Sequence, residues 1–201
     1  MKQIYNLIKK TKSFIHGILD IFKDRSEYQQ STYSPKHEFQ ISYDDVPFSI
    51  KALVDTFVKE FTPLAFAKGL IFAGIHNGED ITVLGNKKFI SSLINNLLAN
   101  AIQCTSNGYV ILNIEYINSK LIICIADSGI GMSESQIRLF NLSEMKFGNT
   151  ELSYSLGRDL TDTLGIVNML RGSIKVFSDA EKGCKFIVQL PLQVHTSIGS
   201  K

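Results

Sequence analysis

The sequence predicts an α/β fold with one principal core. Two kinds of segment alternate along the chain: long stretches with apolar residues at helical spacing, and shorter runs rich in β-branched and aromatic residues. Polar or glycine-bearing turns separate them. A chain of 201 residues, 44% of them hydrophobic, is long enough to bury one good-sized core but short for two. We therefore expect one main domain in which helices and a sheet pack together.

The first segment is predicted to be an isolated amphipathic helix. Apolar residues between Ile4 and Phe22 recur at steps of three and four residues, which places them on one helical face. The polar stretch Asp24–Pro35 that follows is typical of a linker. We expect residues 1–35 to form this helix and linker, and residues 36–201 to form the main domain.

The main domain is predicted to begin with a strand and a long helix. Glu38–Tyr43 alternates polar and apolar residues, as a half-buried strand does. Pro47 is suited to open a helix that runs from about Phe48 to Lys68, and Gly69 is suited to end it.

A second long helix is predicted from Asn86, a residue type that caps helix starts, to about Cys104. Its apolar residues recur at helical spacing, so one face of this helix should be buried. Between the two helices we expect short strands at Leu70–Ile75 and Ile81–Leu84.

The second half of the chain is predicted to contain a hairpin, a long loop and a closing unit. Two β-rich runs, Tyr109–Ile117 and Lys120–Ala126, are separated by Asn118-Ser119 and indicate the hairpin. Ser128 to about Gly157 is longer than an ordinary connection, which is typical of a functional loop, and one short helix is expected near Glu134–Phe140. We expect the closing elements to be a helix at Arg158–Leu170 and strands at Ser173–Ser178 and Lys185–Pro191.

The charge balance argues against a nucleic-acid partner. The chain has 21 Lys and Arg residues against 19 Asp and Glu residues, a net charge of +2. Proteins that bind the phosphate backbone usually carry a dense basic excess.

The cysteines and the hydropathy indicate a reducing compartment and no membrane crossing. Cys104, Cys124 and Cys184 lie far apart within apolar stretches, so we expect buried free thiols. No apolar run approaches the ~18–20 residues that span a bilayer, and the first residues lack a small-residue cleavage site. We therefore expect a soluble, cytoplasmic protein, either free or as the cytoplasmic part of a membrane-bound sensor.

One candidate site is the pair Asn96 and Asn100 on the second long helix. Residues four apart lie on the same helical face, so both amide side chains line one wall. Amide oxygens are suitable ligands for a hard cation such as Mg²⁺ beside a nucleotide. The alternative interpretation is two solvated surface asparagines.

The second candidate is the motif D-S-G-I-G-M at residues 127–132, where a strand ends and a loop begins. A carboxylate there can accept a hydrogen bond from an amino group such as that of adenine. The glycines let the backbone approach a flat ring or a phosphate closely. The alternative interpretation is an ordinary turn with a capping aspartate.

These motifs occur in an order that resembles the catalytic domain of histidine kinases of the GHKL ATPase superfamily, particularly the hybrid-sensor type, over about Phe14 to Leu192. The helix Phe14–Arg25, with I-H-G-I-L-D-I-F-K, is similar to the second helix of the kinase dimerisation hairpin. The stretch Gly85–Thr105, ending in N-N-L-L-A-N-A-I-Q-C-T, resembles the asparagine box, and residues 127–132 resemble the first glycine box. The segments L-R-G-S-I at 170–174 and E-K-G-C-K-F at 181–186 resemble the closing strands of the family.

This resemblance implies a two-layer α/β sandwich, with a mixed sheet packed on helices, that binds ATP and Mg²⁺ and transfers the γ-phosphoryl group to a histidine. At matching positions it implies Asn100 as the magnesium ligand, Asn96 beside the triphosphate at the catalytic centre, and Asp127 on the adenine amino group. The other nucleotide-binding residues that it implies are Gly129, Gly131, Met132, Gly157 and Phe140, the last in the lid segment.

The sequence departs from the family in the second glycine box, normally G-x-G-x-G-L, which aligns with S-L-G-R-D-L at residues 155–160. Only Gly157 is retained, and Ser155 and Asp159 add bulk and a negative charge near the triphosphate. Gln103 and Cys184 stand where the family often has a basic and a hydroxyl residue. We therefore expect ADP and ATP to bind with similar, weak affinity.

The resemblance also implies partners. The phosphoacceptor histidine of such kinases lies on the first dimerisation helix, so we expect it outside this chain, with a response regulator or receiver domain as a further partner and a homodimer in the full-length protein. His16 is interpreted as a helix-surface residue, because it matches the second helix and Gly17 follows it. His37, His76 and His195 have no companion at metal-ligand spacing.

Two alternatives stay open. The first is a degenerate kinase-like module that acts through protein interaction or dimerisation, which the altered second glycine box would favour. The second is another ATPase of the superfamily, such as a chaperone, topoisomerase or mismatch-repair protein. Those proteins place a glutamate where Asn96 stands, and an amide cannot take a proton from water.

Overall fold

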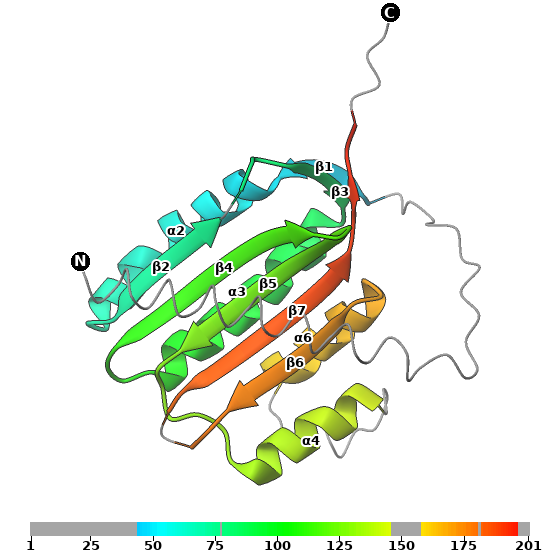
Figure 1. The fold of residues 1–201 in the computed structure, drawn as a ribbon. Helices are drawn as coiled ribbons and strands as arrows, with labels where there is room; N and C mark the ends of the chain where they lie inside the picture. The colour runs from blue at the N-terminus through cyan, green and yellow to red at the C-terminus, as the bar shows by residue number, and fades with distance from the viewer. Residues whose placement is uncertain (1–43, 77, 146–157, 181, 197–201) are drawn as a thin grey trace, which may run out of the picture. The chain divides into compact units, whose positions relative to one another are not determined.

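The computed structural model describes residues 44–76, 78–145, 158–180 and 182–196, and the side chains of 141–145 and 158 are not described (Figure 1). Contacts divide the chain into two units, Met1–Gln40 and Ile41–Lys201, and every described residue belongs to the second. The helix, linker and strand expected before residue 44 lie outside the described residues.

The main feature of the fold is a five-stranded mixed sheet with the strand order β2-β4-β5-β7-β6 (Figure 1). β2 is parallel to β4, and all other neighbours in this sheet are antiparallel. The central pair, β4 and β5, is the predicted hairpin. The strands span Ile71–His76 (β2), Tyr109–Ile117 (β4), Lys120–Asp127 (β5), Ser173–Ser178 (β6) and Cys184–Pro191 (β7).

Three helices cover one face of this sheet (Figure 1). α2 (Ile50–Ala67) packs on β2 and β4, α3 (Lys87–Cys104) on β4 and β5, and α6 (Arg158–Met169) on β6 and on α3. The shorter α4 (Glu134–Met145) contacts β6 at the sheet edge. The structure thus confirms the expected two-layer sandwich. Within the described part of the chain, no helix combines the length and the hydropathy that crossing a membrane requires.

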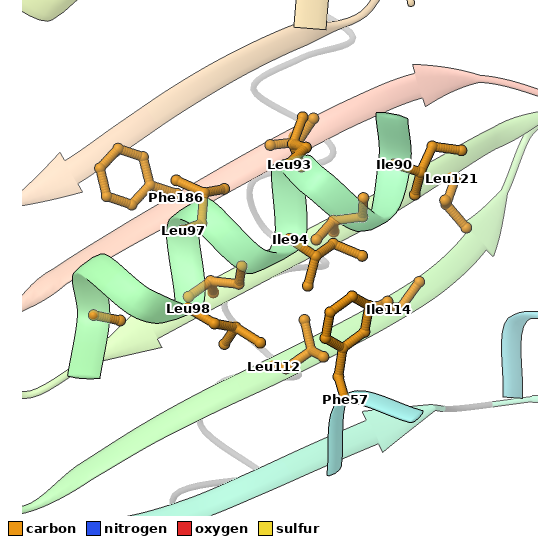
Figure 2. Packing of buried hydrophobic residues seen from close by; sticks show 14 of the residues in the cluster. Phe57, Ile90, Leu93, Ile94, Leu97, Leu98, Leu112, Ile114, Leu121 and Phe186 are labelled. Carbon is orange, nitrogen blue, oxygen red and sulfur yellow. The ribbon is translucent and has the colours of Figure 1, made fainter. Parts of the chain in front are cut away.

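The core lies between α3 and the sheet. Figure 2 shows apolar side chains along one face of α3 directed toward β4, β5 and β7. The helical spacing of these residues in the sequence is what allows one helix to bury all of them. The fully or almost fully buried members shown there include Ile90, Leu93, Ile94, Leu97, Leu98, Leu112, Ile114 and Leu121.

Both ends of α3 are held by side chains. The predicted N-cap is confirmed, because Asn86 Oδ1 accepts a hydrogen bond of 3.0 Å from the Phe89 N–H. At the other end, Lys68 Nζ donates to the carbonyl oxygens of Ile102 (2.6 Å) and Gln103 (2.8 Å). The Lys68 ammonium group also interacts favourably with the negative end of the helix dipole, which lies at the C-terminus of α3.

The start of α2 corrects the sequence prediction. Pro47 and Phe48 belong to a strand, β1 (Val46–Ser49), and Ser49 is the helix cap: its Oγ accepts from Ala52 N at 2.9 Å and donates to Asp80 Oδ1 at 2.6 Å. A serine cap satisfies a free N–H at the helix start, and proline is tolerated in an edge strand. The second sheet, in the order β1-β3-β8, also contains β3 (Thr82–Gly85) and β8 (Gln193–Val194).

We expect Leu98→Ala to lower the free energy of unfolding by about 2–5 kcal/mol, because Leu98 is fully buried and its loss leaves a cavity. Leu64→Ala, the same substitution on α2 at a side chain that is 54% exposed, should cost less than about 1 kcal/mol. Equilibrium unfolding in urea measures both. Equal losses would contradict the placement of this face of α3 in the core.

Candidate functional site

The site is built around Asp127, the last residue of β5. Its side chain is buried, and Oδ1 accepts hydrogen bonds from the N–H groups of Gly129 (2.8 Å) and Cys184 (3.3 Å). Burial raises the pKa of the carboxyl, and these two N–H groups partly oppose that rise. No described residue donates to the other oxygen, Oδ2. The carboxylate is therefore held in one orientation with an acceptor available to a ligand.

The loop after Asp127 is tied to the end of α3 and to the start of β4. Ile130 N donates to the Cys104 carbonyl oxygen at 3.2 Å. Ser128 Oγ accepts from Tyr109 N at 2.9 Å and donates to Asn107 O at 3.1 Å. Polar groups of the loop are thus paired with the protein itself, which fixes the path of the loop.

Close backbone contacts explain the glycines of the loop. A Cβ at Gly129 would collide with the Cys104 carbonyl and lie 2.9 Å from Asp127 Oδ1. Gly131 has φ +68°, and a Cβ there would collide with the Asp179 carbonyl. Gly183, in the turn between β6 and β7, has φ +90° and no room for a Cβ beside the Asp127 carbonyl. These glycines are required by the packing of the loop whether or not they also contact a ligand.

Asn96 and Asn100 lie along α3 on the helix face expected from their spacing, and both are partly buried. Asn100 is one turn before Cys104, the residue whose carbonyl holds the loop, and the Cys104 thiol lies 3.6 Å from Asn100 Oδ1. Burial raises the pKa of that thiol, so it stays protonated and can donate weakly. The structure therefore places Asn100 one helical turn from the contact that holds the Asp127 loop.

The remaining predicted site residues differ in their placement. Met132 is partly buried and packs against the core. Phe140, expected in the lid beside the nucleotide, is fully buried, and its ring packs edge-on against Phe186 with centroids 5.7 Å apart. The structure thus gives Phe140 a place in the core, as an anchor of α4. Gly157 lies outside the described residues, as does Ser155.

The histidines and cysteines do not form a metal site in the part of the chain that is described. No three His, Cys, Asp or Glu side chains gather there, and both ring nitrogens of His76 lie 3.1 Å from carbonyl oxygens, those of Ile114 and Glu79. Cys124 and Cys184 are buried free thiols as expected, whereas Cys104 is partly exposed. Burial raises the pKa of the Cys184 thiol to about 12, so this residue carries no charge beside Asp127.

Sequence reasoning did not single out Ser178, at the end of β6. Its Oγ accepts a hydrogen bond of 2.8 Å from Met132 N. The two residues are 46 positions apart, so no local spacing indicates that they meet.

Comparison with known proteins supports the predicted family. The family described as "Histidine kinase-, DNA gyrase B-, and HSP90-like ATPase" matches residues 85–194, more than half of the 201 residues. This range contains both asparagines and the Asp127 loop.

Curated relatives are sensor kinases. Sensor histidine kinase RcsC of Escherichia coli K12 is 26% identical over 181 residues, which is 89% of this chain and 18% of that protein. Hybrid signal transduction histidine kinase B of Dictyostelium discoideum is 26% identical over 198 residues, 94% of this chain and 10% of that protein. The chain thus spans less than a fifth of the length of these relatives.

Solved structures share the fold. Full-length ShkA in complex with AMPPNP superposes with a TM-score of 0.66 at 20% identity, covering 78% of this chain and 33% of that one. The nucleotide-free catalytic domain of histidine kinase ThkA superposes with a TM-score of 0.60 at 22% identity, covering 73% of this chain and 96% of that one.

We expect Gly131→Ala to destabilise the domain more than Gly69→Ala. Both glycines have φ near +70°, which costs an alanine about 1–2 kcal/mol. A Cβ at Gly69 meets nothing within 4 Å, whereas one at Gly131 collides with the Asp179 carbonyl. The difference between the two free energies of unfolding, measured in urea, isolates this collision, and equal values would mean that the loop does not pack on the β6–β7 turn.

Proposed function

We propose that this chain, which belongs to the histidine kinase-, DNA gyrase B-, and HSP90-like ATPase family, forms the ATP-binding catalytic part of a sensor histidine kinase. It would transfer the γ-phosphoryl group of ATP to a histidine on a dimerisation hairpin. The observation that carries the proposal is the orientation of the Asp127 carboxylate, which two backbone N–H groups hold inside a glycine-bearing loop. The sensor kinases among its relatives support the choice of kinase within the family.

Asp127 would select adenine. Its Oδ1 is already paired with Gly129 N and Cys184 N, so Oδ2 is the oxygen that accepts from the exocyclic amino group of the base. Guanine presents a carbonyl oxygen at the corresponding position, and two acceptors repel each other. A buried carboxylate also makes the bond charge-assisted, hence stronger than one between neutral groups.

Asn96 and Asn100 would face the triphosphate. Amide oxygens suit Mg²⁺, and the described residues offer no carboxylate or histidine cluster near them. The donor set therefore fits a metal that is held by Asn100 together with phosphate oxygens rather than by a protein cage. When bound, Mg²⁺ would supply charge neutralisation on the phosphates. Asn100 would orient the metal, and Asn96 would orient the triphosphate.

The amide of Asn96 favours a kinase over a hydrolase. An amide cannot act as a general base toward water, so this side chain would bind without promoting hydrolysis. Phosphoryl transfer requires positioning and charge neutralisation more than covalent chemistry from this domain. The acceptor helices, a receiver domain or response regulator, and a second copy of the kinase are the partners that this role implies.

We expect Asp127→Ala to weaken ADP binding by ~1.5–3 kcal/mol through loss of a charge-assisted hydrogen bond. Asp55→Ala removes a carboxylate from the exposed face of α2 and should leave binding unchanged. Calorimetry with ADP and GDP measures affinity and base preference. Because burial raises the pKa of Asp127, its protonation, and with it the loss of ADP affinity, should begin at a higher pH than for an exposed aspartate.

Equal ADP affinity of the wild type and Asp127→Ala, or no preference for ADP over GDP, would contradict the adenine contact. A wild type that binds no nucleotide would instead favour the degenerate, protein-binding module.

We expect Asn100→Ala to abolish the dependence of ATP binding on Mg²⁺, because it removes the proposed metal ligand. The fold loses only the weak contact between Asn100 Oδ1 and the Cys104 thiol and should stay intact. Asn95→Ala is the matched control: Asn95 lies on another face of α3, and its Oδ1 is buried without a hydrogen-bond partner among the described residues. Titrations with ATP, with and without Mg²⁺, test both. If Mg²⁺ strengthens binding equally in the wild type and Asn100→Ala, then Asn100 is not the ligand.

A further inference from the structure

We infer that Ser178 is a positioning residue of the nucleotide site: its hydroxyl holds the Asp127–Met132 loop against the β6–β7 turn in the conformation that presents Asp127 to the base. This inference rests on the proposed function, since it assigns a role within the same site. Ser178 itself is not placed against the nucleotide and acts through the loop.

The hydroxyl of Ser178 uses both of its hydrogen-bonding functions. Its oxygen accepts from Met132 N at 2.8 Å, and its O–H donates to the Gly183 carbonyl at 2.7 Å. Ser178 is also paired with Cys184 at the end of the β6–β7 ladder. One side chain thus joins the far end of the loop to the turn that closes the sheet.

The same turn holds Asp127 from the other side. Cys184 N donates to Asp127 Oδ1, and the missing Cβ of Gly183 lets the turn lie against the Asp127 carbonyl. The contacts therefore form a ring, which we call the Asp127 circuit. The loop runs from Asp127 to Met132, and Met132 N donates to Ser178. Ser178 in turn donates to Gly183, and the next residue, Cys184, donates to the Asp127 carboxylate. Removing the Ser178 hydroxyl removes its hydrogen bonds to Met132 N and to the Gly183 carbonyl, so the loop loses its side-chain link to the turn and gains alternative conformations.

Other contacts of the turn cannot replace this hydroxyl. The ion pair of Lys182 with Asp179 is 3.4 Å long, with side chains 76% and 71% exposed. Exposed pairs of this kind contribute little. Alanine at position 178 would offer neither a donor nor an acceptor, whereas threonine keeps the hydroxyl and is well suited to a strand.

The chain supplies a matched control on the same strand. Ser173 lies at the opposite end of β6, paired with Gln189, and is partly buried like Ser178. In the described structure its hydroxyl makes no hydrogen bond. Ser173→Ala therefore applies the same substitution to the same strand without opening the circuit.

The test uses the full chain and three variants, Ser178→Ala, Ser178→Thr and Ser173→Ala. Calorimetry measures ADP affinity, and amide hydrogen exchange followed by NMR measures protection of Met132 N–H. We expect Ser178→Ala to bind ADP about tenfold more weakly, the effect of losing a hydrogen-bonded contact. Its Met132 amide should exchange faster while the amides of β4 and β5 keep their protection. Ser178→Thr and Ser173→Ala should resemble the wild type in both measurements.

Four outcomes would overturn the inference. Three concern Ser178→Ala: unchanged ADP affinity, unchanged protection of its Met132 amide, and a loss of protection that spreads through the whole sheet, which would reflect general destabilisation. The fourth is failure of threonine to restore binding. If the wild type binds no ADP, the proposed function fails with it; if the wild type binds and Ser178→Ala binds equally, only the role of Ser178 fails.

Discussion

The fixed orientation of the Asp127 carboxylate is the constraint on which the rest of the site depends. Two N–H groups hold one of its oxygens, one from the loop that follows it and one from β7, 57 residues further along the chain. Both donors must approach closely, so the loop and the β6–β7 turn have to fold against each other. Gly131 and Gly183 stand where a side chain would prevent that approach, and Gly129 stands where a side chain would collide with the Cys104 carbonyl of α3.

The sandwich brings the two halves of the site together. α3 crosses the sheet over β4 and β5 and ends at Cys104, whose carbonyl pairs with Ile130 of the loop. The buried face of α3 sets the rotation of the helix about its axis, and that rotation decides where Asn96 and Asn100 point. Lys68 holds the carbonyl groups at the same helix end. The packing of apolar side chains on α3 therefore controls the placement of these two polar residues.

Local signals account for what the sequence predicted. Short segments encode three features that the structure confirms. They are the Asn86 cap, the helical spacing of α3 and the hairpin of β4 and β5. β1 and β8 were missed because four and two residues carry too little pattern, and Pro47 suggested a helix start. Within the site, the loop motif indicated a backbone that approaches something closely. It could not show that the nearest neighbours are the carbonyls of Cys104 and Asp179, because those contacts depend on the tertiary fold.

Phe140 and Ser178 both show that a single sequence does not reveal the tertiary neighbours of a residue. The family resemblance implied a place in the lid for Phe140, and it could not show that the ring packs against Phe186 on β7. A serine at a strand end suggested nothing, yet its hydroxyl meets a loop 46 residues earlier in the chain. In both cases the decisive neighbour is far away in the sequence, and a single sequence carries no record of which distant segments lie side by side.

The proposed nucleotide site has a base end and a phosphate end, which depend on different parts of the fold. A substitution can therefore affect one end without affecting the other. The base end is fixed by backbone hydrogen bonds and buried glycines that belong to the sheet. The phosphate end would depend on α3 and, as the family resemblance implies, on the start of α6, where Asp159 stands exposed in the first turn. An acidic side chain there stabilises the helix by offsetting the positive end of its dipole, and for the same reason it weakens the attraction of that helix end for phosphate. Asp159, which stands where the family has a glycine, would therefore weaken binding of the triphosphate without disturbing Asp127. Recognition of adenine and binding of phosphate need not change together in this chain.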